Sequence, residues 1–320
     1  MTIRVVSLRD HHLEDAAHLV AARHREERQH APILPGRFED PGAVLPPLRR
    51  LASESEGIVA LEGGRLVGLL LGMVLPDFKG MRSAYVPEWS HAAVGDRRRR
   101  VYEEMYVEAA TRWVADGCLL HAITLLAHDG EAFDAWNWMG FGMLVIDAVR
   151  GLEPVEGPLP EVDIWRAGLD DVETAMAFDR ALSEYLAEPP TFLLGGEPMD
   201  RAEHVAWLED PERALWVASR RGESVGVIGL QPSNPTAAAT PQGDGSVSIT
   251  RAFTLAPMRG QEVGTALLAR AIDWARTTGY ARCAVDFESA NVLASRFWLR
   301  HFEPVCYSLM RVVDPGHFRG

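Results

Sequence analysis

A glycine-bearing turn precedes a predicted amphipathic helix in the last quarter of the sequence. The segment runs from Arg259 to Thr265 (RGQEVGT), after a strand expected over 247–255 and at the start of a helix expected over 262–278. The first turn of a helix has unpaired backbone amides and the positive end of the helix dipole, and glycines let the backbone approach a ligand. This order of elements predicts a phosphate-binding site that acts mainly through the backbone.

The elements that would position this turn form two similar series on either side of a candidate linker. Residues 151–161 form that linker, because 151–160 hold three prolines and two glycines, too many for a helix or a central strand. We therefore expect domains over 1–150 and 162–320. In the first half, strands are expected at 2–8, 57–61, 66–75, 119–127 and 141–150, and helices at 10–30, 48–55, 96–116 and 130–139. In the second half, strands are expected at 162–166, 214–219, 225–231, 247–255, 281–288 and 304–313, and helices at 169–186, 200–209, 262–278 and 292–300.

The two halves also repeat at a nearly constant spacing. Chance could align one pair of residues, whereas five pairs at almost one offset are better explained by duplication. The pairs 161 residues apart are Trp113 with Trp274 and Phe141 with Phe302, and the pairs 162 apart are Gly117 with Gly279, Asp129 with Asn291, and Trp136 with Trp298.

The second half resembles the GCN5-related N-acetyltransferase (GNAT) superfamily. The superfamily signature is Arg/Gln-x-x-Gly-x-Gly/Ala after a strand, and the sequence matches it at Arg259 and Gly264. The resemblance continues through Asn291, Ala294 and Phe297, which follow the superfamily's Asn-x-x-Ala-x-x-Phe-Tyr helix. It implies an α/β fold (mixed α+β) of two tandem GNAT-like domains, each with a mixed, mostly antiparallel central sheet flanked by helices.

The first half resembles the superfamily in its order of elements alone. An offset of 161 places residues 98–103 over the motif, and these contain no glycine. Asp129 stands at the asparagine position and Trp136 at the tyrosine position. We therefore expect a degenerate copy that supports the fold or shapes a substrate cleft.

By this resemblance the co-substrate is acetyl-coenzyme A, bound by the C-terminal domain. Backbone amides of the turn would hold its diphosphate, and the strand over 247–255 would pair with its pantetheine arm. Glu262 departs from the pattern, because it replaces the first motif glycine and a carboxylate should repel a diphosphate; alternatively, it serves only to complement the helix dipole. The expected binding residues are Thr254, Leu255, Ala256, Arg259, Gly260, Gln261, Glu262, Val263, Gly264, Thr265, Asn291, Ala294 and Phe297.

The implied reaction is direct attack of an amine on the thioester, which needs a general base. The strand over 247–254 has no acid, so the resemblance points to Asp286, five residues before Asn291, with Glu288 on the same strand face as the second choice. The alternative is that Asp286 is an ordinary hydrogen-bonded acid. Trp298 stands where the superfamily has tyrosine and is a catalytic candidate by position, although an indole N–H delivers no proton at neutral pH and packing is its alternative role.

Composition limits the classes of partner. The 320 residues carry a formal net charge of −13, which argues against a general nucleic-acid binder. No apolar run approaches the roughly 20 residues of a membrane span, and the N-terminus lacks a signal segment. The three cysteines suggest reduced thiols, so a cytoplasmic protein is expected. Neither the cysteines nor the histidines have metal-ligand spacing, so no metal is expected.

The leading prediction is an N-acetyltransferase that acts on a small-molecule or peptide amine, with loops at 183–201 and 233–245 selecting the acceptor. A homodimer is compatible with the sequence. Two alternatives stay open: a mycothiol-synthase-like enzyme that acetylates an amino sugar, and a non-catalytic acyl-coenzyme A-binding or sensor protein, which Glu262 and Trp298 would suit.

Overall fold

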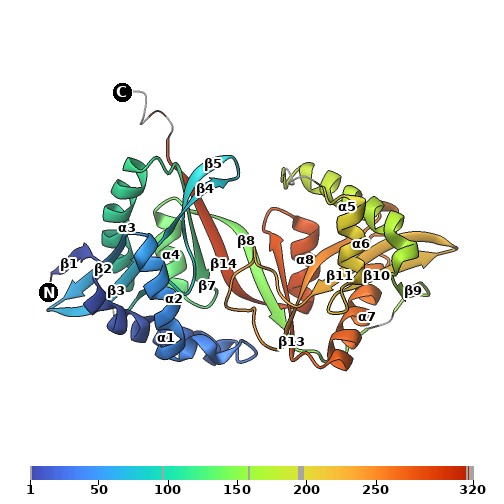
Figure 1. The fold of residues 1–320 in the computed structure, drawn as a ribbon, viewed down its shortest axis with the longest axis horizontal. Helices are drawn as coiled ribbons and strands as arrows, with labels where there is room; N and C mark the ends of the chain where they lie inside the picture. The colour runs from blue at the N-terminus through green and yellow to red at the C-terminus, as the bar shows by residue number, and fades with distance from the viewer. Residues whose placement is uncertain (1, 96, 158, 194–197, 315, 317–320) are drawn as a thin grey trace. The chain divides into compact units, whose positions relative to one another are not determined.

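The computed structural model describes residues 2–95, 97–157, 159–193, 198–314 and 316. They form two compact units (Figure 1). Unit 1 consists of Met1–Asp147, Ala238–Thr240 and Pro304–Gly320, and unit 2 consists of Ala148–Ala237 and Pro241–Glu303. Asp96 at an expected helix start, Pro158 in the expected linker and residues 194–197 in an expected acceptor loop lie outside the described residues.

Unit 1 contains two groups of hydrogen-bonded strands. One has the order β1-β2-β3-β6 and the other the order β4-β5-β7-β14. The β5–β7 pair is parallel and the other pairs within these groups are antiparallel. The strands are β1 (Ile3–Ser7), β2 (Gly57–Glu62), β3 (Arg65–Leu71), β4 (Met73–Phe78), β5 (Met81–Val86), β6 (His91–Ala93), β7 (Leu120–Leu126), β8 (Gly142–Arg150), which extends into unit 2, and β14 (Glu303–Val312). The helices are α1 (Leu13–His30), α2 (Pro41–Glu54), α3 (Arg98–Ala115) and α4 (Gly130–Trp138).

Helix α2 corrects the expectation of a short helix at 48–55, because it already begins at Pro41. The side chain of Asp40 caps the helix by accepting a hydrogen bond from the amide of Gly42, and Pro41 occupies the first turn, where no intrahelical amide bond is needed. Val44 and Leu48 are fully buried on one side of the helix. Capping and burial together outweigh the two internal prolines, Pro46 and Pro47, which dominated the sequence pattern.

The strand expected over 66–75 is divided at Gly72 into β3 and β4. A Cβ atom at Gly72 would lie 3.2 Å from the carbonyl oxygen of Tyr85, a tight contact, so a glycine suits this close approach of the backbone of β5.

The described residues from Pro304 onward (304–314 and 316) belong to unit 1, whereas the domain expected over 162–320 places them in the second domain. Their strand, β14, pairs antiparallel with β7 from Cys306 opposite Leu126 to Val312 opposite Leu120. A ladder between strands this far apart in the chain leaves no local signal, so sequence patterns placed β14 with its nearest neighbours.

Unit 2 is built on strands in the order β13-β12-β11-β10-β9. The β12–β13 pair is parallel and the other pairs are antiparallel, so the sheet is mixed and mostly antiparallel, as predicted. The strands are β9 (Asp163–Arg166), β10 (Ala214–Arg220), β11 (Glu223–Gln231), β12 (Ser246–Thr254) and β13 (Arg282–Glu288). The helices are α5 (Val172–Ala187), α6 (Arg201–Glu209), α7 (Val263–Thr278) and α8 (Val292–His301).

The two faces of the unit 2 sheet follow from strand register. Phe253 pairs with Val227 and clusters with Phe178 of α5 and Trp207 of α6. Thr254 points to the opposite face, where a Cβ atom at Gly226 would lie 3.2 Å from Leu267 of α7. Helix α7 therefore covers one face, and α5 with α6 covers the other.

None of the helices in the described part of the chain is long and apolar enough to cross a membrane.

Candidate active site

The predicted phosphate-binding turn lies at the N-terminus of α7. Gly260 and Glu262 both have left-handed backbone conformations, with φ of 73° and 58°. The first bond into the helix runs from the amide of Ala266 to the carbonyl of Glu262 at 3.0 Å, and no side chain caps the helix. Within the described residues, the amides of Val263, Gly264 and Thr265 therefore have no hydrogen-bond partner, which is the condition for binding an anion.

Glu262 occupies the position where the superfamily motif has glycine. A left-handed conformation costs a non-glycine residue about 1–2 kcal/mol, so the backbone here would be more relaxed with glycine. The carboxylate is held by two contacts: the hydroxyl of Thr265 donates to Oε2 at 2.6 Å, and the Arg300 guanidinium lies 3.8 Å from Oε1. The negative charge thus stays beside the free amides, partly balanced by Arg300.

A wedge opens between β12 and β13 beside this turn. The parallel ladder runs from Ser246 opposite Arg282 to Ile249 opposite Val285 and stops there. Strand β12 continues to Thr254, paired with β11 alone, after a register shift opposite Gly229 and Leu230. The backbone of 250–253 therefore has no strand partner on its β13 side and can pair with an extended ligand, whereas the carbonyl of Thr254 accepts a hydrogen bond from Nε of Arg259 at 3.1 Å.

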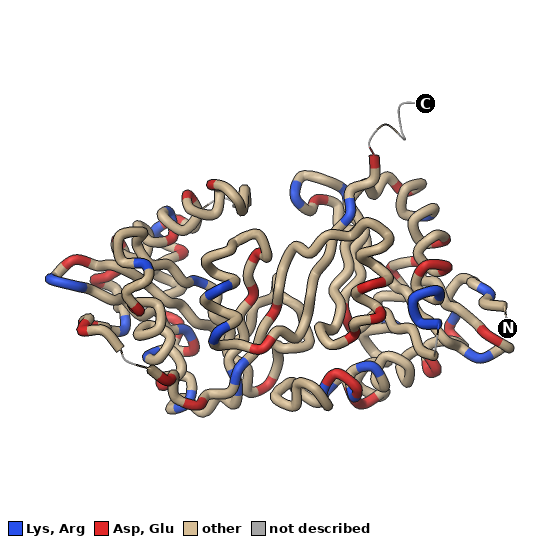
Figure 2. Tube along the Cα trace, turned by 180° about the vertical axis from the view of Figure 1, so that it is seen from behind, with Lys and Arg blue, Asp and Glu red and all other residues tan. Residues whose placement is uncertain are grey.

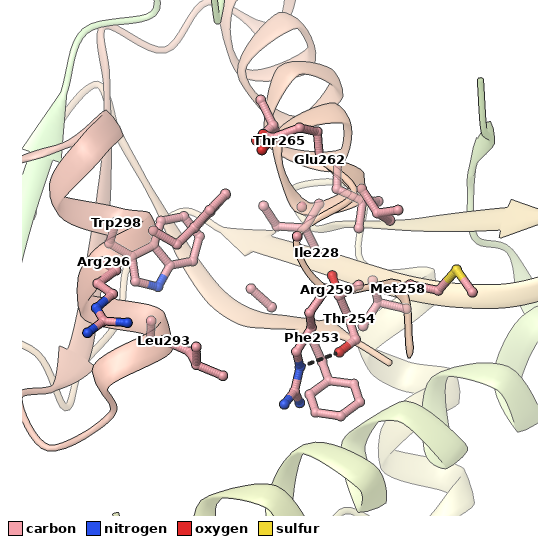
Figure 3. Close-up of a pocket in the computed structure, with 18 of the residues that line it drawn as sticks. Ile228, Phe253, Thr254, Met258, Arg259, Glu262, Thr265, Leu293, Arg296 and Trp298 are labelled. Atoms are coloured by element: carbon pink, nitrogen blue, oxygen red, sulfur yellow. Dashed lines mark hydrogen bonds between the residues drawn. The ribbon is translucent and has the colours of Figure 1, made fainter. Parts of the chain in front are cut away.

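The wedge and the α7 turn enclose a cavity of about 300 Å³, shown in Figure 3. A Cβ atom at Gly264 would lie 3.4 Å from the ring of Phe297, which is an ordinary van der Waals contact, so this wall of the cavity has room for a methyl group but not for a longer side chain. Of the predicted binding residues, those that line the cavity are Thr254, Arg259, Gly260, Glu262, Val263, Gly264, Thr265, Asn291, Ala294 and Phe297.

Three predicted binding residues are not part of the cavity lining. Leu255 packs against the core between the sheet and α5 and α6, and Ala256 begins a short 3-10 turn. Gln261 contacts Arg220 and donates to the carbonyl of Pro257 at 2.8 Å.

Asn291 caps α8 and also contacts α5. Its Oδ1 accepts a hydrogen bond from the amide of Ala294 at 3.2 Å and another from the Tyr185 hydroxyl at 3.0 Å. Tyr185 and Leu182 bring α5 into the cavity lining, which sequence reasoning missed. No local pattern marks these two residues, because they reach the site from more than 100 positions earlier in the chain.

Asp286 and Glu288 lie on β13 next to the wedge but outside the cavity lining. The register of Ile249 with Val285 places Asp286 on the same sheet face as Phe253. Oδ1 of Asp286 accepts a hydrogen bond from Nδ2 of Asn234 at 2.7 Å. Burial raises the pKa of Asp286; the Asn234 hydrogen bond opposes this and the nearby charge of Glu288 adds to it.

Trp298 is buried and lines the cavity. Its ring packs edge-on against Phe297 and Phe302, with centroids 4.8 and 5.4 Å apart. This aromatic cluster favours the packing interpretation of Trp298 over a proton-donating role.

The corresponding wedge of unit 1 is filled by its own side chains. The β5–β7 ladder stops at Val86 opposite Ile123, and Nε2 of His91 donates to the next carbonyl, that of Thr124, at 2.8 Å. Nδ1 of His91 accepts from the Tyr102 hydroxyl at 3.0 Å, which places the ring between β7 and α3.

The cationic start of α3 is also neutralised within unit 1. Arg98 lies 2.9 Å from Asp129, which caps α4 and also pairs with Arg23. Within the residues that the structure describes, His91 therefore occupies the edge of β7, and Arg98 at the motif position is paired with Asp129.

Comparison with protein families identifies the C-terminal part. Residues 180–302 match the Acetyltransferase (GNAT) family, over a range that includes the α7 turn and α8. This segment is a GNAT domain, and the resemblance drawn from the sequence is confirmed. A sequence comparison with curated proteins found no match.

Solved structures share the fold over nearly the whole chain. A GCN5-related N-acetyltransferase from Sphaerobacter thermophilus is 17% identical, with 98% of this chain and 96% of that chain covered and a TM-score of 0.58. A tandem GNAT protein from the clavulanic acid biosynthesis pathway is 16% identical over 98% of this chain and 99% of that chain, with a TM-score of 0.50. At these identities the likeness shows the fold, two GNAT-like domains in tandem.

A third structure is a GCN5-related glucosamine N-acetyltransferase region of a fungal multi-domain GH3 β-N-acetylglucosaminidase. It is 14% identical, with 97% of this chain covered and a TM-score of 0.55, and the chain spans 38% of that fungal protein's length.

Proposed function

We propose that unit 2 binds acetyl-coenzyme A and transfers its acetyl group to an amine. The observation that carries this proposal is the set of three unpaired amides at the start of α7, beside a wedge where residues 250–253 of β12 have no strand partner on one side. These are the two features that a diphosphate and an extended pantetheine arm need.

In the transfer, the amine nitrogen attacks the thioester carbonyl carbon, a C–N bond forms and the C–S bond breaks. The amine loses one proton, and the departing thiolate takes up one proton to become the free thiol. Thiols have a pKa of about 8.5, so the thiolate leaves readily and water can protonate it. Trp298 then has no proton to supply, in agreement with its packing.

Asp286 is the proposed general base. Its raised pKa makes it a better proton acceptor than an exposed aspartate, and Asn234 fixes the orientation of its carboxylate. It adjoins the point where the wedge opens, because the last ladder pair is formed by the preceding residue, Val285. Because Asp286 is outside the cavity lining, the proton reaches it through a water molecule or from an acceptor bound on the α5 side.

The second candidate function is acyl-coenzyme A binding without turnover. Glu262 favours it, because its carboxylate lies next to the amides of α7 and would weaken binding of a diphosphate. The position of Asp286 outside the cavity lining also favours binding without turnover.

Calorimetry with acetyl-coenzyme A tests the binding proposal. Gly264→Leu should abolish binding, because a Cβ atom there would already be in contact with Phe297 at 3.4 Å and the rest of the leucine side chain would have to occupy the cavity or displace its wall. Gly130→Leu is the matched control, since Gly130 also begins a helix, α4, but has open space around it. Absence of binding by the wild type would reject both candidate functions, whereas binding with no thiol release across a panel of amines would support the second.

A further inference from the structure

Arg259 has an unusual setting for a cation on the cavity wall. Its Nε donates to the carbonyl of Thr254 at 3.1 Å, and its guanidinium carbon lies 4.4 Å from the ring centre of Tyr185 and 5.5 Å from that of Phe253. Within the described part of the chain no carboxylate pairs with it, although neighbouring Arg251 is paired with Asp179 at 3.4 Å. The guanidinium is therefore held in place by aromatic rings and left without a counter-charge.

The direction of this side chain separates it from the α7 turn. Figure 3 shows Arg259 extending alongside Phe253, away from Glu262 and Thr265 at the start of α7. Register puts Phe253 on the α5 side of the sheet, which is the side of Asp286 as well. The cation thus points to the half of the cavity where the amine must meet its base.

A half-buried cation without a partner loses part of its hydration and gains no ion pair in return. The chain carries a net charge of −13, and acidic residues are spread through both units (Figure 2), so an anion is repelled at long range and needs a local cation to bind. A guanidinium fixed at Nε still presents its terminal nitrogens, which suit the two oxygens of a carboxylate.

We propose that Arg259 binds a carboxylate of the acceptor, so that the substrate is an amine that also carries a carboxyl group, as in an amino acid. This inference rests on the proposed acetyl transfer and specifies its acceptor. Tyr185 holds the guanidinium in place: its ring packs against the guanidinium, and its hydroxyl donates a hydrogen bond to Asn291 at 3.0 Å. The carboxylate on Arg259 then holds the amine on the Asp286 side of the sheet.

The test compares matched acceptors in the full-length protein. The twenty amino acids and their carboxamides are assayed in pairs by thiol release, and their binding to the coenzyme A-loaded protein is followed by calorimetry. We expect at least one acid to be preferred over its amide by about 10- to 100-fold in kcat/KM, the range for a hydrogen bond to a charged group. Arg259→Gln should remove that preference by raising the KM of the acid, and this rise should exceed the change in the acetyl-coenzyme A Kd, which is measured in parallel because Arg259 also lines the cavity proposed for the coenzyme.

Two variants separate the alternatives. Arg296→Gln removes a second cation of the cavity lining, on α8, where Arg300 also lines the cavity and lies 3.8 Å from Glu262. Arg276→Gln removes an exposed arginine paired with Asp273 at the end of α7. Both should keep the preference for the acid. The inference is overturned if no pair shows a preference, if the preference survives Arg259→Gln, or if Arg259→Gln weakens acetyl-coenzyme A as strongly as the acid. In each of these results the wild type still binds acetyl-coenzyme A. If the proposed function itself is wrong, the wild type should show no acetyl-coenzyme A binding or no thiol release with any acceptor.

Discussion

The hydroxyl of Thr265 donates a hydrogen bond to Oε2 of Glu262 at 2.6 Å, so the carboxylate is fixed beside the first turn of α7. The other oxygen faces Arg300 across 3.8 Å. Glu262 thus places an internal anion next to amides that have no other partner, and it does so from a left-handed backbone conformation. A bound diphosphate would compete with this carboxylate for the same dipole.

Glu262→Gly should therefore improve both stability and binding. Glycine removes about 1 kcal/mol of backbone strain. Loss of the carboxylate should lower the Kd for acetyl-coenzyme A by roughly tenfold, since one repulsive contact of about 1–2 kcal/mol disappears. Urea unfolding and calorimetry measure the two effects. Arg221→Gly is the matched control. Arg221 has a φ of 56° in the β10–β11 turn, so glycine should relieve the same backbone strain there, and the variant should bind acetyl-coenzyme A with the wild-type Kd. Weaker binding by Glu262→Gly would show that the carboxylate assists the ligand.

Asp286→Asn should lower kcat by about 100-fold or more, the usual effect of removing a general base. The wild-type rate should fall as pH decreases through the pKa of Asp286, which burial raises above the ordinary 3.8, and the variant should lack that fall. A raised aspartate pKa means that the folded state prefers the protonated form, so its contribution to stability falls as pH rises from 3.8 through the folded pKa. The variant should accordingly be no less stable than the wild type at neutral pH.

Glu288→Gln is the control for that experiment, because Glu288 shares the β13 face with Asp286. It should keep most of the wild-type rate. Equal losses of kcat in Asp286→Asn and Glu288→Gln would indicate a general effect of negative charge on this sheet face. A normal kcat in Asp286→Asn would show that Asp286 is not the general base.

The parts of this site that could be predicted from sequence are those with local signals. The α7 turn is marked by glycines at fixed spacing before an amphipathic helix, and Asn291 is the cap of the helix that follows it. Both depend on residues within one or two turns of each other. The same locality explains why the order of strands and helices in unit 2 follows the sequence pattern.

The parts that could not be predicted depend on contacts between distant segments. Tyr185 reaches Asn291 and Asn234 reaches Asp286 across 106 and 52 positions, and neither pair has a periodic signature. The position of Asp286 outside the cavity lining likewise depends on where the ladder with β12 ends, which is a property of register.

Two buried histidines should make unit 1 sensitive to acid. Burial lowers the pKa of His24 to about 3 and that of His91 to about 4. The folded state therefore prefers the neutral rings, and the stability they give is complete above the unfolded pKa of 6.5 and is lost as pH falls toward 4. At pH 5, protonation of each unfolded-state histidine should have lowered the free energy of unfolding by about 2 kcal/mol relative to neutral pH. Urea unfolding between pH 7.5 and 5 measures this loss. His91→Gln should reduce the slope, whereas His18→Gln, at an exposed position, should not; a flat profile in the wild type would contradict the prediction.

The chain should bind one acetyl-coenzyme A, although it contains two GNAT-like domains. In unit 1 the hydrogen bond from His91 to the Thr124 carbonyl closes the edge of β7, and a pantetheine arm could pair there only by displacing a buried ring. Asp129 in turn neutralises Arg98 at the motif position. Calorimetric stoichiometry and native mass spectrometry should give one ligand per chain, and Gly264→Leu should reduce that number to zero. A stoichiometry of two, or one site that survives Gly264→Leu, would place binding in unit 1 and require the histidine to move.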